Sequence, residues 1–211
     1  MRVRISLMVC ASAVVLLAGT AGAQPGTVIV EGRGGGMLPV GSFRHLQNDG
    51  GGYSIAAGYE FNDFLDMFLE FTHSFNDNDN VVIHGPGFTA TSNETNQTFV
   101  VSMGPRVNFV PSDFVVRPYG LFQVGWYHFA NFNSIKVNGQ TLLDDDDQDA
   151  VGVQAGLGLE GTVFQLYQRR GDKVPLLEMT LGAEGAFHQA FLANKDDRQF
   201  VTVMGTVGFR F

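Results

Sequence analysis

The sequence predicts an all-β fold, specifically an eight-stranded antiparallel up-and-down transmembrane β-barrel. Three observations support this prediction: eight segments alternate between apolar and small or polar residues, the charged residues keep to one of the two faces, and short connections alternate with long ones. Successive side chains of a strand point to opposite sides, so a period of two gives each strand two distinct faces. In a membrane barrel, one face meets lipid and the other lines the interior.

The C-terminal segment Gln199–Phe211 shows the alternation most clearly. One face carries Val207, Phe209 and Phe211, while the opposite face is small or polar and ends with Arg210. A soluble protein rarely ends on an apolar strand with a terminal Phe, whereas the closing strand of a membrane barrel can do so. We therefore expect this segment to close the barrel.

Seven earlier segments show the same pattern. In the third of them, for example, Leu65, Met67, Leu69 and Phe71 occupy alternate positions. Each segment is long enough for a tilted transmembrane strand, which needs about 9–11 residues. In chain order, the seven predicted strands are Thr27–Leu38, Gly52–Phe61, Phe64–Phe75, Gln97–Val110, Phe114–Phe129, Ala150–Phe164 and Leu176–Phe191.

The charged residues indicate which face points inward. The apolar faces carry no Asp, Glu, Lys or Arg in their central parts. Buried charges have to be paired, and an eight-stranded barrel leaves little free bore, so we expect an ion-pair network that plugs the lumen. A gated pore and a proton path are the alternatives. The predicted lumen residues are Glu31, Arg33, Glu60, Asp66, Glu70, Arg106, Arg117, Glu160, Glu178, Glu184 and Arg210.

A soluble barrel such as a lipocalin would show the same alternation, with its apolar residues inside. Two features favour the membrane barrel: the charged faces are rich in small residues, and aromatic residues gather at the strand ends, as they do in interfacial girdles. We expect one rim at Phe61, Phe64, Phe109 and Phe114, and the other at Phe75, Trp126, Phe129, Phe187 and Phe191.

The connections predict the orientation of the barrel. Asn62–Asp63 and Pro111–Asp113 are short, whereas the alternate connections 39–51, 76–96, 130–149 and 192–198 are longer. Only the sixth connection, 165–175, is longer than this alternation predicts. In outer-membrane barrels, short turns face the periplasm and long loops face outside. We therefore expect four acidic or polar loops on the cell surface.

The N-terminal segment 1–23 has the features of a secretory signal peptide. Arg2 and Arg4 precede an apolar stretch that is too short to span a bilayer, and Ala21 and Ala23 fit a cleavage site. The single cysteine, Cys10, lies in this segment, so residues 24–211 are predicted to form one cysteine-free barrel domain. The chain has a net charge of −8, which argues against nucleic acid as a partner.

These patterns together resemble the small eight-stranded outer-membrane barrels, the group of the OmpA transmembrane domain, OmpX and porin-family barrel domains. The most specific parts are Val207–Phe211, similar to the C-terminal assembly signal of that family, and Arg117–Trp126, similar to a common mid-barrel strand. The resemblance implies the outer membrane of a Gram-negative cell, and insertion by the barrel-assembly machinery that reads Val207, Phe209 and Phe211. It does not imply one activity.

Two further motifs have simpler interpretations. The glycines of Gly156–Gly161 match GxGxxG, but they lie in an alternating strand with no helix after it, so a dinucleotide site is not expected. The acidic run Asp144–Asp147 with Asp149 has the charge to bind a divalent cation but lacks the spacing of an EF-hand loop. We interpret it as a solvated loop, and we predict no metal and no cofactor.

The histidines raise the question of an enzyme that modifies lipid A. A lipid-facing His-x-Ser pair on one strand would be the signature of a deacylase of this kind, and the sequence contains no such pair. Ser74 directly follows His73, and His128 precedes Phe129 and Ala130. We interpret His188 as one half of a polar pair with Glu184 at the rim of the barrel, because acyl transfer needs His, Ser and an acid placed together.

The sequence therefore predicts a non-enzymatic, integral outer-membrane protein that supports the cell envelope and displays surface loops. Its predicted partners are outer-membrane lipid and lipopolysaccharide, together with the barrel-assembly machinery during insertion. The alternatives are a surface adhesin or ligand-binding barrel acting through loops 76–96 and 130–149, a narrow pore, and a lipid A-modifying enzyme.

Overall fold

The computed structural model describes residues 26–41, 48–77, 81–85, 88–111, 114–137, 140–145, 147–167, 175–193 and 197–211. The predicted signal peptide lies outside these residues. The described strands are β1 (Val28–Val40), β2 (Gly50–Asn62), β3 (Leu65–Asp77), β4 (Val81–Gly85), β5 (Phe88–Asn108), β6 (Val116–Val137), β7 (Gln140–Asp145), β8 (Gln148–Leu166), β9 (Leu177–Phe191) and β10 (Arg198–Arg210).

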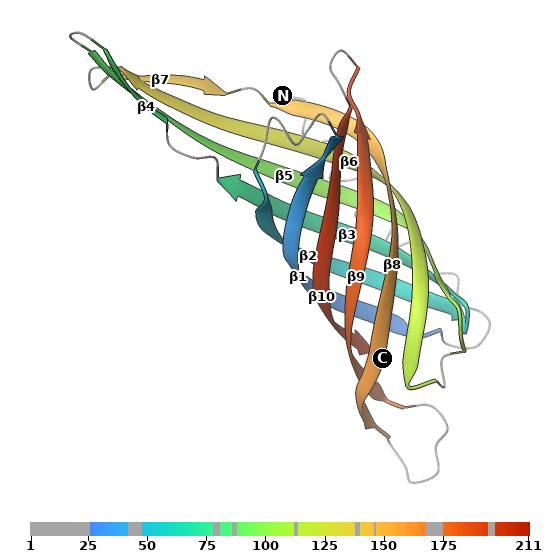
Figure 1. Ribbon diagram of the computed structural model, residues 1–211. Coiled ribbons are helices and arrows are strands. Elements are labelled where there is room, and N and C mark those ends of the chain that lie inside the picture. The colour runs from blue at the N-terminus through green and yellow to red at the C-terminus, as the bar shows by residue number, and fades with distance from the viewer. Residues whose placement is uncertain are drawn as a thin grey trace.

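Eight of these strands close into an antiparallel barrel, which confirms the predicted fold class (Figure 1). The order around the barrel is β5-β3-β2-β1-β10-β9-β8-β6, and β5 pairs with β6 to complete the circle. The first and last strands meet along their whole length, from Ile29 opposite Arg210 to Val40 opposite Gln199. Closure leaves the barrel strands without a free edge inside the bilayer, where backbone groups have no water to bond.

The two longest predicted loops are largely strand, so that part of the prediction was wrong. β5 and β6 remain paired as far as Ala90 opposite Val137, and the short strands β4 and β7 pair along their outer sides. These four strands form a sheet that extends past the other barrel strands, at the upper left of Figure 1.

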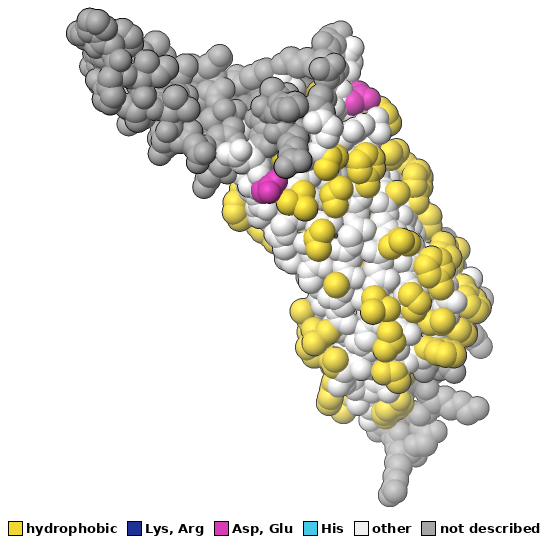
Figure 2. All heavy atoms as spheres, in the orientation of Figure 1, with side chains coloured by type: hydrophobic (Ala, Val, Ile, Leu, Met, Phe, Trp, Pro, Cys, Tyr) yellow, Lys and Arg dark blue, Asp and Glu magenta, His cyan; other side chains and the backbone are white. Residues whose placement is uncertain are grey.

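The alternation of faces follows the prediction. On β8, Leu157 is 67% exposed, whereas Gln154 is 2% exposed and points into the barrel. Figure 2 shows hydrophobic side chains over the side of the barrel, with no Lys or Arg among them on this face. The exposed face is thus apolar and the shielded face polar, the reverse of a soluble barrel, and this arrangement favours lipid as the surrounding medium.

One residue predicted at the outer rim lies elsewhere. Phe129 is completely buried inside the barrel, because it shares the parity of Arg117 and Tyr127 on β6. Its neighbour Trp126 has the opposite parity and is exposed on the outside. The error came from assigning Phe129 by its position near the end of a strand, although the alternation itself placed it inward.

Among the described residues, no helix has the length and apolar character needed to cross a membrane.

A charge at mid-height on the outer face tests the lipid-facing assignment. We expect Leu157→Arg to lower the free energy of unfolding by roughly 2–4 kcal/mol, because an arginine near the bilayer midplane is costly. Val163→Arg, on the same face of β8 but close to the periplasmic turn, should cost about 0–1 kcal/mol. Urea unfolding in lipid vesicles measures both, and equal costs at the two depths would contradict the membrane assignment.

Candidate functional site

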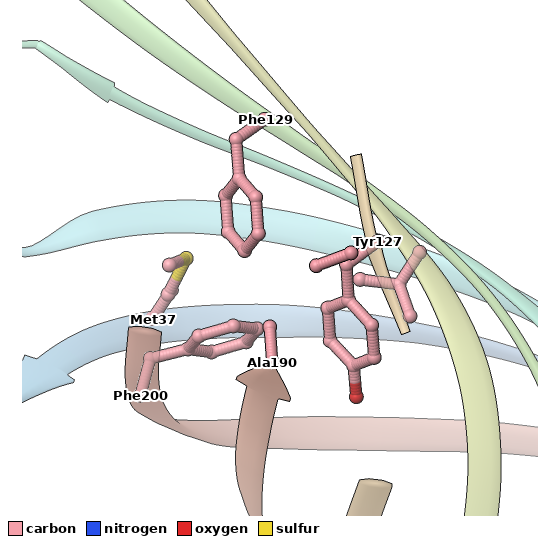
Figure 3. Close-up of a cluster of buried hydrophobic side chains, with 7 residues drawn as sticks. Met37, Tyr127, Phe129, Ala190 and Phe200 are labelled. Atoms are coloured by element: carbon pink, nitrogen blue, oxygen red, sulfur yellow. The ribbon is translucent and has the colours of Figure 1, made fainter. Parts of the chain in front are cut away.

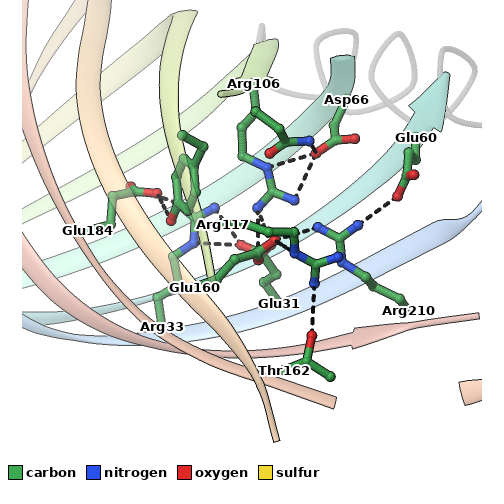
Figure 4. Close-up of polar contacts among 12 residues, drawn as sticks. Glu31, Arg33, Glu60, Asp66, Arg106, Arg117, Glu160, Thr162, Glu184 and Arg210 are labelled. Atoms are coloured by element: carbon green, nitrogen blue, oxygen red, sulfur yellow. Dashed lines mark hydrogen bonds and ion pairs between the residues drawn. The ribbon is translucent and has the colours of Figure 1, made fainter. Parts of the chain in front are cut away.

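The lumen holds a continuous network of charged side chains in its periplasmic half (Figure 4). The structure brings together all eleven charged lumen residues predicted from the sequence. The side chains of Arg33, Arg106 and Arg117 are at most 2% exposed, and the most accessible member, Glu60, is 12% exposed. Charges this deeply shielded stay ionised only when they are paired and hydrogen-bonded.

Arg33 on β1 binds three carboxylates from three strands. Its Nη2 lies 2.8 Å from Glu31 Oε2, and its Nη1 donates to Glu70 Oε2 at 3.0 Å and to Glu184 Oε1 at 2.9 Å. Glu31 lies on β1, Glu70 on β3 and Glu184 on β9, so one guanidinium connects strands on both sides of β1.

Arg106 on β5 makes a second centre. It donates to Glu31 Oε1 at 2.6 Å and to Asp66 Oδ2 at 2.8 Å, and Glu160 Oε2 lies 3.6 Å away. Glu31 therefore joins Arg106 to Arg33. Bidentate and charge-assisted hydrogen bonds of this kind are about twice as strong as neutral ones.

The guanidinium of Arg106 also lies between two aromatic rings. Its central carbon is 4.4 Å from the ring centroid of Phe68 and 4.8 Å from that of Tyr119. Both distances fall within the range of cation–π attraction, which strengthens when the cation is desolvated. Arg106 is therefore fixed at its edge by carboxylates and at its faces by aromatic rings.

Arg117 and Arg210 complete the network near the periplasmic turns. Arg117 pairs with Glu178 and lies 3.1 Å from Glu160, while Arg210 donates to Glu60 and to Glu160, each at 2.6 Å. Glu160 thus meets three arginines, which joins the two halves of the network into one.

Every strand of the barrel contributes to this network, because each strand carries at least one charged residue at a position whose side chain points inward. Seven acids face four arginines, and each acid is paired with at least one arginine. The contributions are Glu31 and Arg33 from β1, Glu60 from β2, Asp66 and Glu70 from β3, Arg106 from β5, Arg117 from β6, Glu160 from β8, Glu178 and Glu184 from β9, and Arg210 from β10.

Neutral side chains supply hydrogen bonds that the arginines do not. The hydroxyl of Tyr119 donates to Glu184 Oε2 at 3.0 Å, and that of Thr72 donates to Glu70 Oε1 at 3.0 Å. Such donors stabilise ionised carboxylates when acids outnumber bases. They offset part of the excess negative charge inside the barrel.

A cluster of apolar side chains lies in the extracellular half of the lumen, and the sequence analysis missed it (Figure 3). Met37, Tyr127, Phe129 and Phe200 converge there with no exposed surface, and Val100, Ala150 and Ala190 complete the cluster. We call these seven residues the apolar plug. Their parity was available in the sequence, but the analysis took the inward faces to be polar throughout.

His188 connects the two layers, and its predicted position at the rim was wrong. The ring is 1% exposed and stacks on Phe200 with centroids 4.4 Å apart. Its Nδ1 is 3.2 Å from the hydroxyl of Tyr127, and its Nε2 is 3.1 Å from the hydroxyl of Thr202. Both ring nitrogens therefore have a hydroxyl partner below the apolar plug, and Glu184 pairs instead with Arg33.

The residues of the predicted assembly signal lie at the periplasmic end of β10. Val207 and Phe209 are each 38% exposed and Phe211 is 59% exposed, all on the outer face. The backbone of Phe211 exchanges two hydrogen bonds with Val28, at 2.9 and 3.1 Å, so the last residue takes part in barrel closure.

No cluster of three or more metal-binding side chains occurs among the described residues. Most side chains of the acidic run 144–149 lie outside that part of the chain.

Comparisons with known proteins agree with the architecture. Residues 11–163 match the family model of the outer membrane protein beta-barrel domain. No curated protein matches the chain. Among solved structures, Ail of Yersinia pestis, crystallised with the heparin analogue sucrose octasulfate, shares 16% identity at a TM-score of 0.51, covering 89% of this chain and 100% of Ail.

Two Pseudomonas aeruginosa proteins are also similar. The N-terminal barrel of OprF shares 16% identity at a TM-score of 0.41, covering 88% of this chain and 99% of that domain. OprG shares 10% identity at a TM-score of 0.43, covering 90% of this chain and 96% of OprG. Of these three structures, only Ail has a TM-score above 0.5. Its likeness supports the fold and nothing beyond the fold.

Removing one arginine tests whether the network holds the barrel together. We expect Arg106→Ala to lower the free energy of unfolding by about 3–5 kcal/mol, because it leaves the buried carboxylate of Asp66 without its arginine and removes one of the cations bound to Glu31. Urea unfolding of the refolded protein measures this loss. Adding Asp66→Asn to Arg106→Ala should restore part of it, since the amide does not need a cation. An unchanged stability in the single variant would contradict the role given to Arg106.

Proposed function

The chain belongs to the family of outer membrane protein beta-barrel domains and lies in the outer membrane, and on this premise we propose that it is a non-enzymatic structural protein of the cell envelope. In this role, the closed barrel anchors the protein. The sheet formed by β4, β5, β6 and β7, called the β4–β7 sheet, presents a surface outside the cell. The observation that carries the proposal is the filled lumen, with the ion-pair network in one half and the apolar plug in the other.

The filled lumen argues for a structural barrel over a pore. Arg106 and Phe200 lie at different heights in the barrel, and both are shielded by their neighbours. Arg106 is 1% exposed and Phe200 is 0% exposed. An ion crossing this path would have to displace both a paired charge layer and a packed aromatic layer. Interiors of eight-stranded barrels are narrow enough for side chains to fill them.

The placement of the histidines supports a non-enzymatic role. Ser74 is 1% exposed and points into the lumen, whereas the ring of His73 lies outside against Tyr53 and Phe99. His128 lies outside and pairs with Asp149. An acyl-transfer site needs nucleophile, base and acid within hydrogen-bond reach, and these two histidines lie on the opposite side of the wall from Ser74.

A second candidate function is the binding of an extracellular ligand, which the β4–β7 sheet favours. β4 and β7 are the outer strands of that sheet, and each pairs with a barrel strand on one side. Such edges can accept an added strand from a partner. Ail, a barrel of similar fold, was crystallised in complex with a different kind of ligand, the heparin analogue sucrose octasulfate.

Truncating the extracellular sheet separates the two functions. Residues 78–94 and 132–146 would each be replaced by an Asn-Gly hairpin turn, which suits two-residue connections between antiparallel strands. In a strain lacking the gene, we expect the truncated barrel to restore detergent resistance as well as the full chain does, because anchoring resides in the eight barrel strands.

The folded amount of each variant is measured by its heat-modifiable mobility in isolated outer membranes. Leu157→Arg, which disturbs the membrane-spanning part, serves as the matched control and should restore less resistance. If the truncated barrel accumulates in folded form and yet fails to restore resistance, the extracellular sheet carries the function and the binding proposal replaces the structural one.

The role of Phe211 in the predicted C-terminal assembly signal can be tested separately. Replacing the last side chain by Phe211→Ala keeps the two backbone hydrogen bonds to Val28, so an effect reports on the aromatic ring itself. We expect a smaller heat-modifiable fraction in the outer membrane and more degradation in the periplasm. Phe114→Ala, another exposed aromatic close to a periplasmic turn, should leave the folded fraction unchanged, and equal fractions for the two variants would remove the special role of Phe211.

A further inference from the structure

A row of polar and aromatic side chains crosses the outer face of the barrel on the extracellular side. Tyr53, His73, Phe99, His128 and Asp149 lie directly opposite one another on β2, β3, β5, β6 and β8. We call these five residues the outer-rim row. It is unusual because it places two imidazoles and a carboxylate on a face that is otherwise apolar.

The row is held in a defined geometry. His73 Nδ1 is 3.3 Å from the hydroxyl of Tyr53, and the His73 ring stacks on Phe99 with centroids 4.5 Å apart. His128 Nδ1 is 2.9 Å from Asp149 Oδ1, and the His128 ring stacks on Trp126 at 5.5 Å. In both histidines Nδ1 is therefore occupied, which leaves Nε2 as the nitrogen for another partner.

His73 Nε2 has no hydrogen-bond partner in the protein. A polar atom shielded from water and left without a partner is destabilising, so such an atom calls for an explanation in a native structure. Phe99 and the neighbouring Phe75 pack around this ring, and they shield Nε2 from water. A ligand oxygen that reached this depth would satisfy it.

The depth of the row matches the outer headgroup region. A tilted strand crosses the hydrocarbon in about 9–11 residues. Counted from the periplasmic turn before Leu65, this length ends at His73–Phe75, and counted from Val116 it ends near Trp126. His128 and Asp149 therefore lie just outside the hydrocarbon, where the side chain of Asp149 is 66% exposed.

The charges decide which headgroup fits. Every arginine whose side chain is described lies in the lumen or, for Arg198, over the ring of Phe129 inside the barrel. A phosphate at the outer-rim row would thus meet the Asp149 carboxylate with no described lysine or arginine to balance it. Sugar hydroxyls, in contrast, donate to a carboxylate and both donate to and accept from an imidazole, and their ring faces pack on aromatic side chains.

We propose that the outer-rim row, with Trp126 beside it, binds the sugar headgroup of an outer-leaflet glycolipid. Asp149 and His128 bind ring hydroxyls at the level of the headgroup, and His73 Nε2 takes a hydroxyl or ester oxygen deeper in the interface. Trp126 and Phe99 provide the aromatic surface. This inference rests on the outer-membrane location and is independent of the structural role proposed above.

Trp126 makes the proposal measurable, because it is the single tryptophan of the chain. The refolded full barrel would be reconstituted into phosphatidylcholine vesicles with increasing fractions of a diglucosamine-based glycolipid. We expect a saturable change in Trp126 fluorescence, and the same change with the dephosphorylated glycolipid. Phosphatidylglycerol, which is anionic without a sugar, and free inorganic phosphate should give no saturable change.

Two variants and one control identify the binding groups. Asp149→Ala and His128→Leu should each weaken the response roughly tenfold, the size of one lost hydrogen bond that involves a charged group. Phe61→Leu removes an exposed aromatic beside the turn at Asn62–Asp63, at the opposite end of the barrel from the outer-rim row, and should leave the titration unchanged. Heat-modifiable mobility confirms that each variant is folded.

Other outcomes of the same titration would contradict the proposed glycolipid site. A response that rises in proportion to glycolipid without saturating, or that is the same in Asp149→Ala as in the unaltered protein, would overturn the proposal. A response confined to phosphorylated glycolipid and phosphatidylglycerol would show that charge and not sugar is bound, which also overturns it.

Discussion

The pairing of charge inside a closed wall is the constraint on which the rest of this structure depends. Eleven ionisable side chains are removed from water in the lumen, and the cost of burying their charges is recovered only if each finds a partner. The four arginines meet this demand by each binding several acids, and Glu31 and Glu160 link them into one network. Because the contributions come from all eight barrel strands, the network also fixes how those strands stand relative to one another.

This arrangement explains why the wall and the interior have such different compositions. The outside is apolar because lipid surrounds it, and the inside is polar in its periplasmic half because the network needs carboxylates and guanidinium groups. The extracellular half uses a different solution, in which Phe129, Phe200 and Met37 pack against one another and Arg198 lies over the ring of Phe129. His188 lies between the two with a hydroxyl on each ring nitrogen, so neither layer leaves it unsatisfied.

The extracellular side departs from a simple barrel in two ways. β5 and β6 run on beyond the other barrel strands with β4 and β7 at their sides, which gives the protein an extended sheet in place of two long loops. Below that sheet, the outer-rim row puts imidazole and carboxylate groups on the outer face of the barrel. Both features lie where the chain meets its surroundings, whereas the lumen serves the barrel itself.

The sequence by itself determined the barrel strands and the two faces of each, because side-chain direction in a strand has a strictly local period. It also determined which charges share the interior, from Glu31 on the first strand to Arg210 on the last. Only the tertiary structure decided which acid meets which arginine, since Arg33 and Glu184 are distant in sequence and meet only after the barrel closes with a given register.

The same reason accounts for what the sequence left undecided or assigned wrongly. Phe129 and Phe200 form an apolar plug only because closure brings β6 and β10 to face each other across the lumen. Tyr53 and Asp149 belong to one row only because the registers of four strand pairs align them. Strand register and closure depend on contacts far apart in the chain, and no local pattern of residues encodes them.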